Sequence, residues 1–172
     1  MILSPLQDGA MFGKADWIRT APRISQYFGG NYVTYVRFGM KGHNGIDFVC
    51  PIGTPIFAPF DGEVTALETT DGYGIHAKIR SRDKLLECVL GHLSQIKTTK
   101  RYVKMGDVIG YSGNTGFSTG PHLHFGVRRL LDKKETELSE LPIEDYGNGF
   151  FGYFDPLPFL IRWKGTFEKN SL

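Results

Sequence analysis

One stretch of the sequence decides how this chain is expected to fold: His122-Leu123-His124-Phe125-Gly126-Val127-Arg128. Side chains in a β-strand alternate between two faces, so both histidines would share one face and the apolar residues between them the other. A helix would instead turn the two histidines to different sides. The pattern therefore predicts a strand with one face on the core and two imidazoles directed into a polar cleft. The alternative is a pair of surface histidines on an exposed strand face.

Other short runs rich in valine, isoleucine, phenylalanine, tyrosine and threonine are separated by 22 glycines and 9 prolines. Little helical periodicity is present, and alternating apolar and polar residues are typical of strands. The predicted strands cover residues 46–49, 55–58, 62–67, 75–81, 85–91, 107–111 and 122–129. Asp61-Gly62 and Asp71-Gly72 lie between such runs, where glycine supplies the positive φ of a tight turn. We predict a mainly β fold, a compact antiparallel β-sheet or sandwich domain with long loops that form a groove.

The length of 172 residues suits one domain, and the sequence contains no internal repeat or linker. We expect an N-terminal arm at residues 1–23 and a single domain at residues 24–172. Residues 132–145 hold six acids and two lysines, which predicts an exposed acidic insertion within that domain. Cys50 and Cys88 match no zinc-finger or redox spacing, and we interpret them as buried free thiols.

The charge balance and the apolar runs exclude several classes of protein. The formal net charge is +2, with 22% charged and 41% hydrophobic residues, so nothing favours nucleic acid as the main partner. No run reaches the roughly 18 apolar residues that a membrane span needs, and no basic segment followed by an apolar run marks a secretory signal. We expect a monomer with no nucleic-acid partner and no membrane span.

Four of the five histidines gather with one aspartate in three short segments, at residues 42–47, 91–94 and 120–125. Neutral imidazole is the commonest protein ligand of zinc, and a nearby carboxylate favours a divalent metal. In an extended chain the Cα atoms of His43 and Asp47 would be roughly 13 Å apart, too far to bind one ion directly. The chain must curl there, and Gly42 and Gly45 provide the freedom. A histidine that stabilises its own turn through Asp47 is the alternative.

Two more histidines and one loop require separate interpretation. His92 follows a predicted strand beside a glycine, which leaves space for a ligand or a second strand. His76 shares a strand face with Lys78 and Arg80, so we interpret it as solvent-exposed and exclude it from the site. The glycine-rich loop at residues 112–120 lacks the lysine of a phosphate-binding loop and leads into a strand, so we predict a wall of the cleft.

Taken together, these segments resemble the lysostaphin-type (LytM-like) zinc endopeptidases, which cut peptide bonds in peptidoglycan. The resemblance covers roughly residues 24–160 and includes the runs Ile24-Ser25-Gln26-Tyr27-Phe28-Gly29, Gly53-Thr54-Pro55-Ile56, Asp61-Gly62, Ser112 through Phe125 and Phe154-Asp155-Pro156. It implies that His43, Asp47 and His124 bind one Zn²⁺ per chain, with His92 and His122 as the catalytic pair. It also implies a compact antiparallel fold of the duplicated-hybrid-motif type with a loop-lined groove.

Zinc chemistry suggests the mechanism that such a site would use. Three protein ligands leave a fourth position for water, whose pKa falls to about 7 when bound. The resulting hydroxide would attack the scissile carbonyl, while His92 and His122 orient the water, pass its proton to the leaving amine and stabilise the oxyanion. One alternative is a catalytically silent LytM-like module that binds or activates other wall hydrolases. A phosphoryl carrier is another, although Asp47 has no evident role in it.

The implied place of action is the bacterial cell wall, outside the cytoplasm. Because no export signal is visible, we expect a phage-encoded lysin or tail enzyme released by another route, or a mature form without its leader, and we favour the phage setting. Glycine-bridged and directly cross-linked stem peptides are both open as substrates. Candidate aromatics for the rim of the groove are Tyr32, Tyr35, Phe38 and Phe117.

Overall fold

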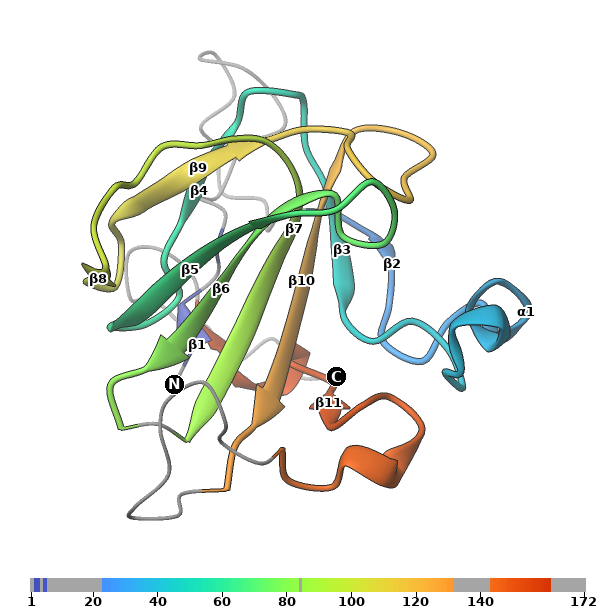
Figure 1. Ribbon diagram of the computed structural model, residues 1–172. Coiled ribbons are helices and arrows are strands. Elements are labelled where there is room, and N and C mark those ends of the chain that lie inside the picture. Colours follow the sequence, from blue (N-terminus) through green and yellow to red (C-terminus); the bar gives the residue numbers. More distant parts are fainter. Residues whose placement is uncertain (1, 4, 6–22, 84, 132–142, 162–172) are drawn as a thin grey trace.

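Strands dominate the computed structural model, which describes residues 2–3, 5, 23–83, 85–131 and 143–161. In these residues one connected sheet has ten strands, and a separate ribbon has two (Figure 1). The strands of the sheet are β2 (Ile24–Gln26), β3 (Ile46–Val49), β4 (Pro55–Phe57), β5 (Gly62–Glu68), β6 (Ile75–Ser81), β7 (Leu86–Ile96), β8 (Tyr102–Val103), β9 (Val108–Ser112), β10 (His122–Arg129) and β11 (Tyr153–Phe154). The ribbon pairs β1 (Ile2–Leu3) in parallel with β12 (Leu160–Ile161). Helical segments are short: α1 (Tyr32–Tyr35), η1 (Val36–Phe38), η3 (Tyr146–Asn148) and η4 (Leu157–Phe159).

The strand order in the sheet is β2-β3-β10-β7-β6-β5-β8, with β11 beside β10 and β9 paired with both β4 and β7. Every pair in this sheet is antiparallel. In Figure 1, β5, β6, β7 and β10 run side by side through the centre, β4 and β9 lie above them, and α1 projects beyond β2. The prediction of a mainly β, antiparallel fold is confirmed, in the form of one open sheet.

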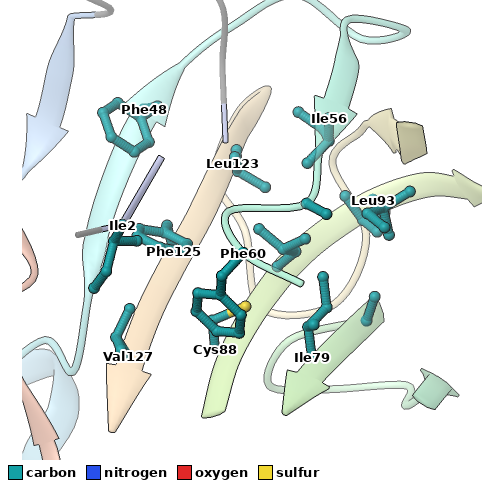
Figure 2. Packing of buried hydrophobic residues seen from close by; sticks show 14 of the residues in the cluster. Ile2, Phe48, Ile56, Phe60, Ile79, Cys88, Leu93, Leu123, Phe125 and Val127 are labelled. Carbon is teal, nitrogen blue, oxygen red and sulfur yellow. The ribbon is translucent and has the colours of Figure 1, made fainter. Parts of the chain in front are cut away.

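The core lies on one face of this sheet and confirms the alternation predicted for the stretch at residues 122–128. Leu123, Phe125 and Val127 are fully buried, at 0% exposure. Figure 2 shows them gathered with side chains from other segments, among them Phe48, Ile56, Ile79 and Ile2. Burying one such side chain contributes about 1.5–3 kcal/mol, so this face stabilises the pairing of β10 with its neighbours.

The predicted strand at residues 85–91 is longer in the structure, where β7 spans Leu86–Ile96. Its first part pairs with β6 and β10, and its last part turns to pair with β9. The sequence prediction ended the strand at Gly91 and interpreted this glycine as leaving space for a ligand or a second strand. In the structure Gly91 is the direct partner of His124 on β10, so the space beside it admits a second strand.

The two Asp-Gly pairs behave differently. Gly72 has a φ of 60°, which confirms the predicted turn after Asp71. Gly62 is the first residue of β5, as predicted, but its φ is not positive, so the positive φ predicted for this glycine is wrong. A Cβ at Gly62 would collide with the backbone oxygen of Arg80 on β6. Glycine is therefore needed at this point for close strand approach rather than for a turn.

Most of the predicted N-terminal arm and acidic insertion lies outside the described residues, so the division at residue 23 stays a prediction. Ile2 is buried in the core, at 3% exposure. Leu130 and Ile143, on either side of residues 132–142, form an antiparallel bridge. Cys50 and Cys88 are buried and free, which confirms the interpretation from sequence. Among the described residues no helix is long and apolar enough to cross a membrane.

Candidate metal centre and active site

The pairing of β3 with β10 brings two groups of the candidate site face to face. Asp47 is the direct antiparallel partner of His124, although the two are 77 positions apart in the chain. Next to them, Ile46 pairs with Phe125, and both of these side chains are fully buried in the core. Because strand residues alternate, the apolar pair on the core face directs Asp47 and His124 to the opposite face.

His43 reaches the same place because the chain curls before β3, as its separation from Asp47 required. The N–H of His43 donates to the carbonyl oxygen of Gly30, and its own carbonyl accepts the N–H of Gly29, each at 2.8 Å. A Cβ at Gly45 would lie only 2.7 Å from Cε1 of His124. Glycine at this position is therefore what lets the curled segment approach the imidazole of β10.

Three atoms converge at this point: His43 Nε2, Asp47 Oδ1 and His124 Nδ1. Each nitrogen lies 3.1 Å from Oδ1, and the two nitrogens are 2.8 Å apart. All three residues are buried, at 1%, 6% and 3% exposure respectively. In tetrahedral zinc sites with bonds of about 2.0–2.1 Å, neighbouring ligand atoms are roughly 3.3 Å apart. The triangle of atoms is therefore close to the size of one face of such a tetrahedron.

The three converging atoms of the triangle have fewer N–H donors than acceptor lone pairs. Nδ1 of His43 lies 3.3 Å from the carbonyl oxygen of Tyr27, which can only accept, so the neutral form of His43 presents the lone pair of Nε2 to the triangle. Asp47 Oδ1 is also an acceptor. Nε2 of His124 is buried without a hydrogen-bond partner among the described residues. At most one proton, on Nδ1 of His124, is left for three converging atoms. A divalent cation would satisfy them, so these residues fit zinc.

The ionisation of the same residues suits a metal. Burial would raise the pKa of Asp47, but hydrogen bonds with His124 and His43 outweigh it and hold that pKa well below its usual range. Burial lowers the pKa of His124 to about 4, although the hydrogen bond with Asp47 opposes this shift. At neutral pH the site therefore presents a charged carboxylate and a neutral imidazole, which are the states that bind metal.

His92 and His122 stand beside the triangle, with ring centroids 4.5 Å apart. Nε2 of His122 lies 3.6 Å from Asp47 Oδ2, so this pair borders the candidate metal site directly. His92 Nδ1 donates to the carbonyl oxygen of Thr115, and His122 Nδ1 donates to that of Gly120, each at 2.8 Å. In the neutral form of each ring, this hydrogen bond leaves Nε2 as an acceptor. Burial lowers the pKa of His92 to about 4, so this residue is neutral near pH 7.

The backbone of His92 is unusual. Its φ is 59°, in the left-handed region that residues other than glycine rarely adopt. Its N–H donates to the carbonyl oxygen of Tyr73 at 2.8 Å, and the β6–β7 register shifts between Ile75 and Ala77. An irregularity of this kind re-aims a side chain, and backbone strain concentrates at functional sites. No local sequence signal other than the adjacent glycine indicated it.

A pocket of about 300 Å³ opens beside the triangle, and His92 and His124 form part of its wall. Of the predicted rim aromatics, Tyr35, Phe38 and Phe117 line this pocket, whereas Tyr32 is not among the lining residues and is 57% exposed. Phe117 belongs to the glycine-rich loop, which agrees with the wall predicted there. The lining residues that sequence analysis missed are Met40, Asn44, Gly72, Tyr73 and Phe151.

The two tyrosines that line the pocket lie beside the candidate metal ligands. Asn44 Nδ2 donates to the hydroxyl of Tyr73 at 2.6 Å, and the Tyr73 ring centroid lies 5.0 Å from that of His124. The Tyr35 ring centroid lies 5.2 Å from that of His43. Burial, with a contribution from the charge of Asp47, raises the pKa of Tyr35 to about 12, so its phenol keeps its proton at neutral pH.

His76 corrects one prediction from sequence. It lies on the strand face predicted for it, but it is only 3% exposed, so the interpretation as a solvent-exposed histidine is wrong. Its Nδ1 donates to the carbonyl oxygen of Gly74 at 2.8 Å, and the Tyr73 ring centroid is 5.5 Å away. The segment that carries Tyr73 covers this end of the face, which strand alternation alone could not indicate. His76 lies outside the triangle, in agreement with its exclusion from the site.

Comparison with known proteins supports the same assignment. The sequence profile of Peptidase_M23, described as Peptidase family M23, matches residues 41–138 of the 172. The chain is 43% identical over 86 residues to the DD-carboxypeptidase/endopeptidase Mpg of Neisseria meningitidis, covering 50% of this chain and 20% of that protein. It is 39% identical over 122 residues to the peptidoglycan DD-endopeptidase ShyC of Vibrio cholerae, covering 70% and 28%. The chain thus spans less than a third of the length of these relatives.

Solved structures similar to this chain support the same family assignment. The catalytic domain of the antimicrobial peptidase lysostaphin from Staphylococcus simulans is 30% identical with a TM-score of 0.60, covering 80% of this chain and 91% of that one. A zinc containing peptidase from Vibrio cholerae is 29% identical with a TM-score of 0.57, covering 75% and 37%. These matches confirm the resemblance to lysostaphin-type proteins seen in the sequence. Because the family profile matches more than half of the chain, this protein belongs to Peptidase family M23.

Proposed function

We propose that this chain is a zinc-dependent endopeptidase that hydrolyses peptide cross-links or stem peptides of bacterial peptidoglycan. The observation that carries the proposal is the buried triangle of His43, Asp47 and His124 with His92 and His122 beside it. Membership of a peptidase family supports the reaction. The name of the relative ShyC supports peptidoglycan as the substrate, and the zinc containing structural neighbour supports the metal.

In this proposal His43, Asp47 and His124 hold one zinc ion, and the chain acts as a monomer at the cell wall. Zinc bound there would polarise the scissile carbonyl and lower the pKa of a water molecule. His92 and His122, with their Nε2 atoms free, accept the proton of the attacking water and pass it to the leaving amine. When protonated, they also stabilise the negative charge that develops on the carbonyl oxygen. The neutral phenol of Tyr35 is a further donor beside the site.

Two other functions explain the geometry less well. A catalytically silent module that binds or activates other wall hydrolases would not need both imidazoles anchored through Nδ1 with Nε2 left free. A phosphoryl carrier would have to place a phosphate on a histidine beside a charged carboxylate. Oδ1 of Asp47 lies only 3.1 Å from His43 and from His124, and it would repel that phosphate.

The proposal is tested with purified, zinc-loaded protein and two kinds of peptidoglycan, one glycine-bridged and one directly cross-linked. We expect one zinc per chain by elemental analysis, a monomer by light scattering, and soluble fragments with new amino termini by mass spectrometry. A chelator should stop their release, and added zinc should restore it. Release that continues in chelator would contradict the zinc mechanism. Zinc and wall binding without release of fragments would favour the silent module.

A further inference from the structure

Arg37 is a cation held at the edge of the candidate active site. Its guanidinium carbon lies 4.6 Å from the ring centroid of Phe38 and 4.2 Å from that of Phe117. The two ring centroids are 5.6 Å apart, and the rings meet edge to face. Both rings line the pocket that also contains His92 and His124. The guanidinium of Arg37 therefore contacts two rings at once, that of the adjacent Phe38 and that of Phe117 in the glycine-rich loop, beside the proposed reaction centre.

Four described arginines lie over an aromatic ring, and Arg37 differs from the other three in its lack of a carboxylate partner. Those other than Arg37 each have a carboxylate partner, and the ion pairs are Arg101–Glu63 at 2.6 Å, Arg128–Glu87 at 2.5 Å and Arg129–Glu144 at 3.9 Å. Arg37 contacts two rings but forms no ion pair with a described residue. The residues that line the adjacent pocket include no aspartate or glutamate. Within the described residues, Arg37 thus has aromatic contacts but no carboxylate to neutralise its charge.

A guanidinium that contacts aromatic rings still donates through the N–H groups that the rings do not cover. The planar edge of the group matches a carboxylate, which can accept two parallel hydrogen bonds from it. Arg37 is exposed and contacts two rings that line the pocket, so a ligand can reach it from solvent. Contact with two rings also restricts the side chain before a ligand arrives, which reduces the entropy lost on binding.

We propose that Arg37 binds a free carboxylate of the substrate close to the scissile peptide bond. The inference rests on the proposed function and deepens it, because it selects a substrate class. A directly cross-linked stem peptide whose cross-linking diamino acid keeps a free second carboxyl group carries a carboxylate beside the cross-link, whereas a glycine bridge is an uncharged chain. The site would therefore prefer the acidic, directly cross-linked substrate. Hydrogen bonds to charged groups are worth enough to change a rate by roughly ten- to one-hundred-fold.

The experiment compares two synthetic cross-linked stem-peptide dimers that differ only at the carboxyl group next to the scissile bond. One dimer carries the free carboxylate and the other the carboxamide. With zinc-loaded wild-type protein we expect kcat/KM to be about ten- to one-hundred-fold higher for the carboxylate. In Arg37→Gln the ratio of the two kcat/KM values should fall to near one. Arg37→Lys should give an intermediate ratio, because lysine keeps the charge but not the planar edge.

Arg82→Gln is the matched control, since Arg82 is also exposed but lines a different pocket, and it should keep the wild-type ratio. Zinc content equal to wild type shows that a variant retains its metal site. A wild-type ratio near one, or a ratio that Arg37→Gln leaves unchanged, would overturn the proposal. If wild type cleaves neither dimer, the proposed function fails, and calorimetric titration of both dimers decides the role of Arg37 separately. Tighter binding of the carboxylate by wild type than by Arg37→Gln would support it, and equal binding would overturn it.

Discussion

Two buried carboxylates on this sheet have opposite surroundings. Glu87 on β7 is 1% exposed and accepts hydrogen bonds from Nε of Arg80 at 2.8 Å and Nε of Arg128 at 2.9 Å. Asp47 on β3 is 6% exposed, and its ion-pair contacts with the described residues are all with histidines. Arginine is charged at every relevant pH, whereas burial lowers the pKa of His124 to about 4, so this partner of Asp47 is neutral at pH 7.

The pKa of each carboxyl group is lowered, but for different reasons. For Glu87, burial acts in the opposite direction and is outweighed by the charge of Arg128 and by the hydrogen bond and charge of Arg80. For Asp47, burial is outweighed mainly by hydrogen bonds with two histidines. The charge of Glu87 is thus balanced within the chain. Asp47 has no arginine or lysine partner among the described residues, which suits the metal ligand proposed for it.

The largest effect should come from Asp47→Asn. This change keeps the shape of the side chain but removes the charge that a metal would bind. We expect zinc affinity to fall by more than about a hundredfold, since even residues behind a ligand alter it about 10–100-fold. Hydrolysis of peptidoglycan should be lost with the metal. Elemental analysis after dialysis and a fragment-release assay measure both effects. Retention of one zinc by Asp47→Asn would show that the two carboxylates do not differ in this way.

Alanine at His124 and at His122 should separate metal binding from catalysis. His124→Ala removes a proposed ligand, so zinc and activity should both disappear. His122→Ala removes a neighbouring imidazole, so it should keep about one zinc while hydrolysis falls by a factor on the order of 10²–10⁴. The same zinc and activity assays apply. If both variants lost the metal equally, the assignment of His124 to metal binding and of His122 to catalysis would be wrong.

Glu87→Gln should affect stability instead of metal binding. It leaves two arginines near the core without their carboxylate, and breaking a buried ion pair costs roughly 3–5 kcal/mol. Because the side chain of Arg80 is 25% exposed, we expect the lower end of that range, about 3 kcal/mol. Urea unfolding measures the change, and zinc content should stay at the wild-type level. A loss of zinc in this variant with an unchanged free energy of unfolding would contradict the comparison.

The smallest effect is the pH dependence of that stability. The pKa of Glu87 in the folded protein lies below its ordinary value of 4.5, so the unfolded chain takes up the proton first as the pH falls. The stabilisation by Glu87 is therefore complete above about pH 4.5 and is lost as the pH falls through the folded pKa. In chelator-treated protein, the free energy of unfolding of wild type should fall more steeply in this acidic range than that of Glu87→Gln. Parallel curves would show that Glu87 is not stabilised by its arginines.

Much of the fold could be predicted because strand alternation is a local property. The predicted strands at residues 46–49, 75–81 and 122–129 have the same bounds in the structure. Prediction failed where contacts outside the strand decide the surroundings of a residue. His76 alternates as an exposed residue would, but Tyr73, in the turn just before the strand, lies against it. Gly62 looks like a turn glycine, but a neighbouring strand approaches it too closely for any side chain.

The candidate site divides in the same way. The residue types and spacings of the histidine segments, with the family resemblance, were enough to nominate all five proposed site residues. The sequence contained no local sign that Arg37 meets Phe117, that His92 has a positive φ, or that Glu87 lies between two arginines. Each of these features depends on contacts between different strands or loops, which the local sequence does not reveal.

The sequence by itself determined which faces of the strands are apolar and which residues can bind a metal, because both follow from side-chain chemistry and a repeat of two residues. Only the tertiary structure decided that Asp47 faces histidines while Glu87 faces arginines. Partners across a sheet depend on strand register, and register is set when the whole apolar face packs into one core.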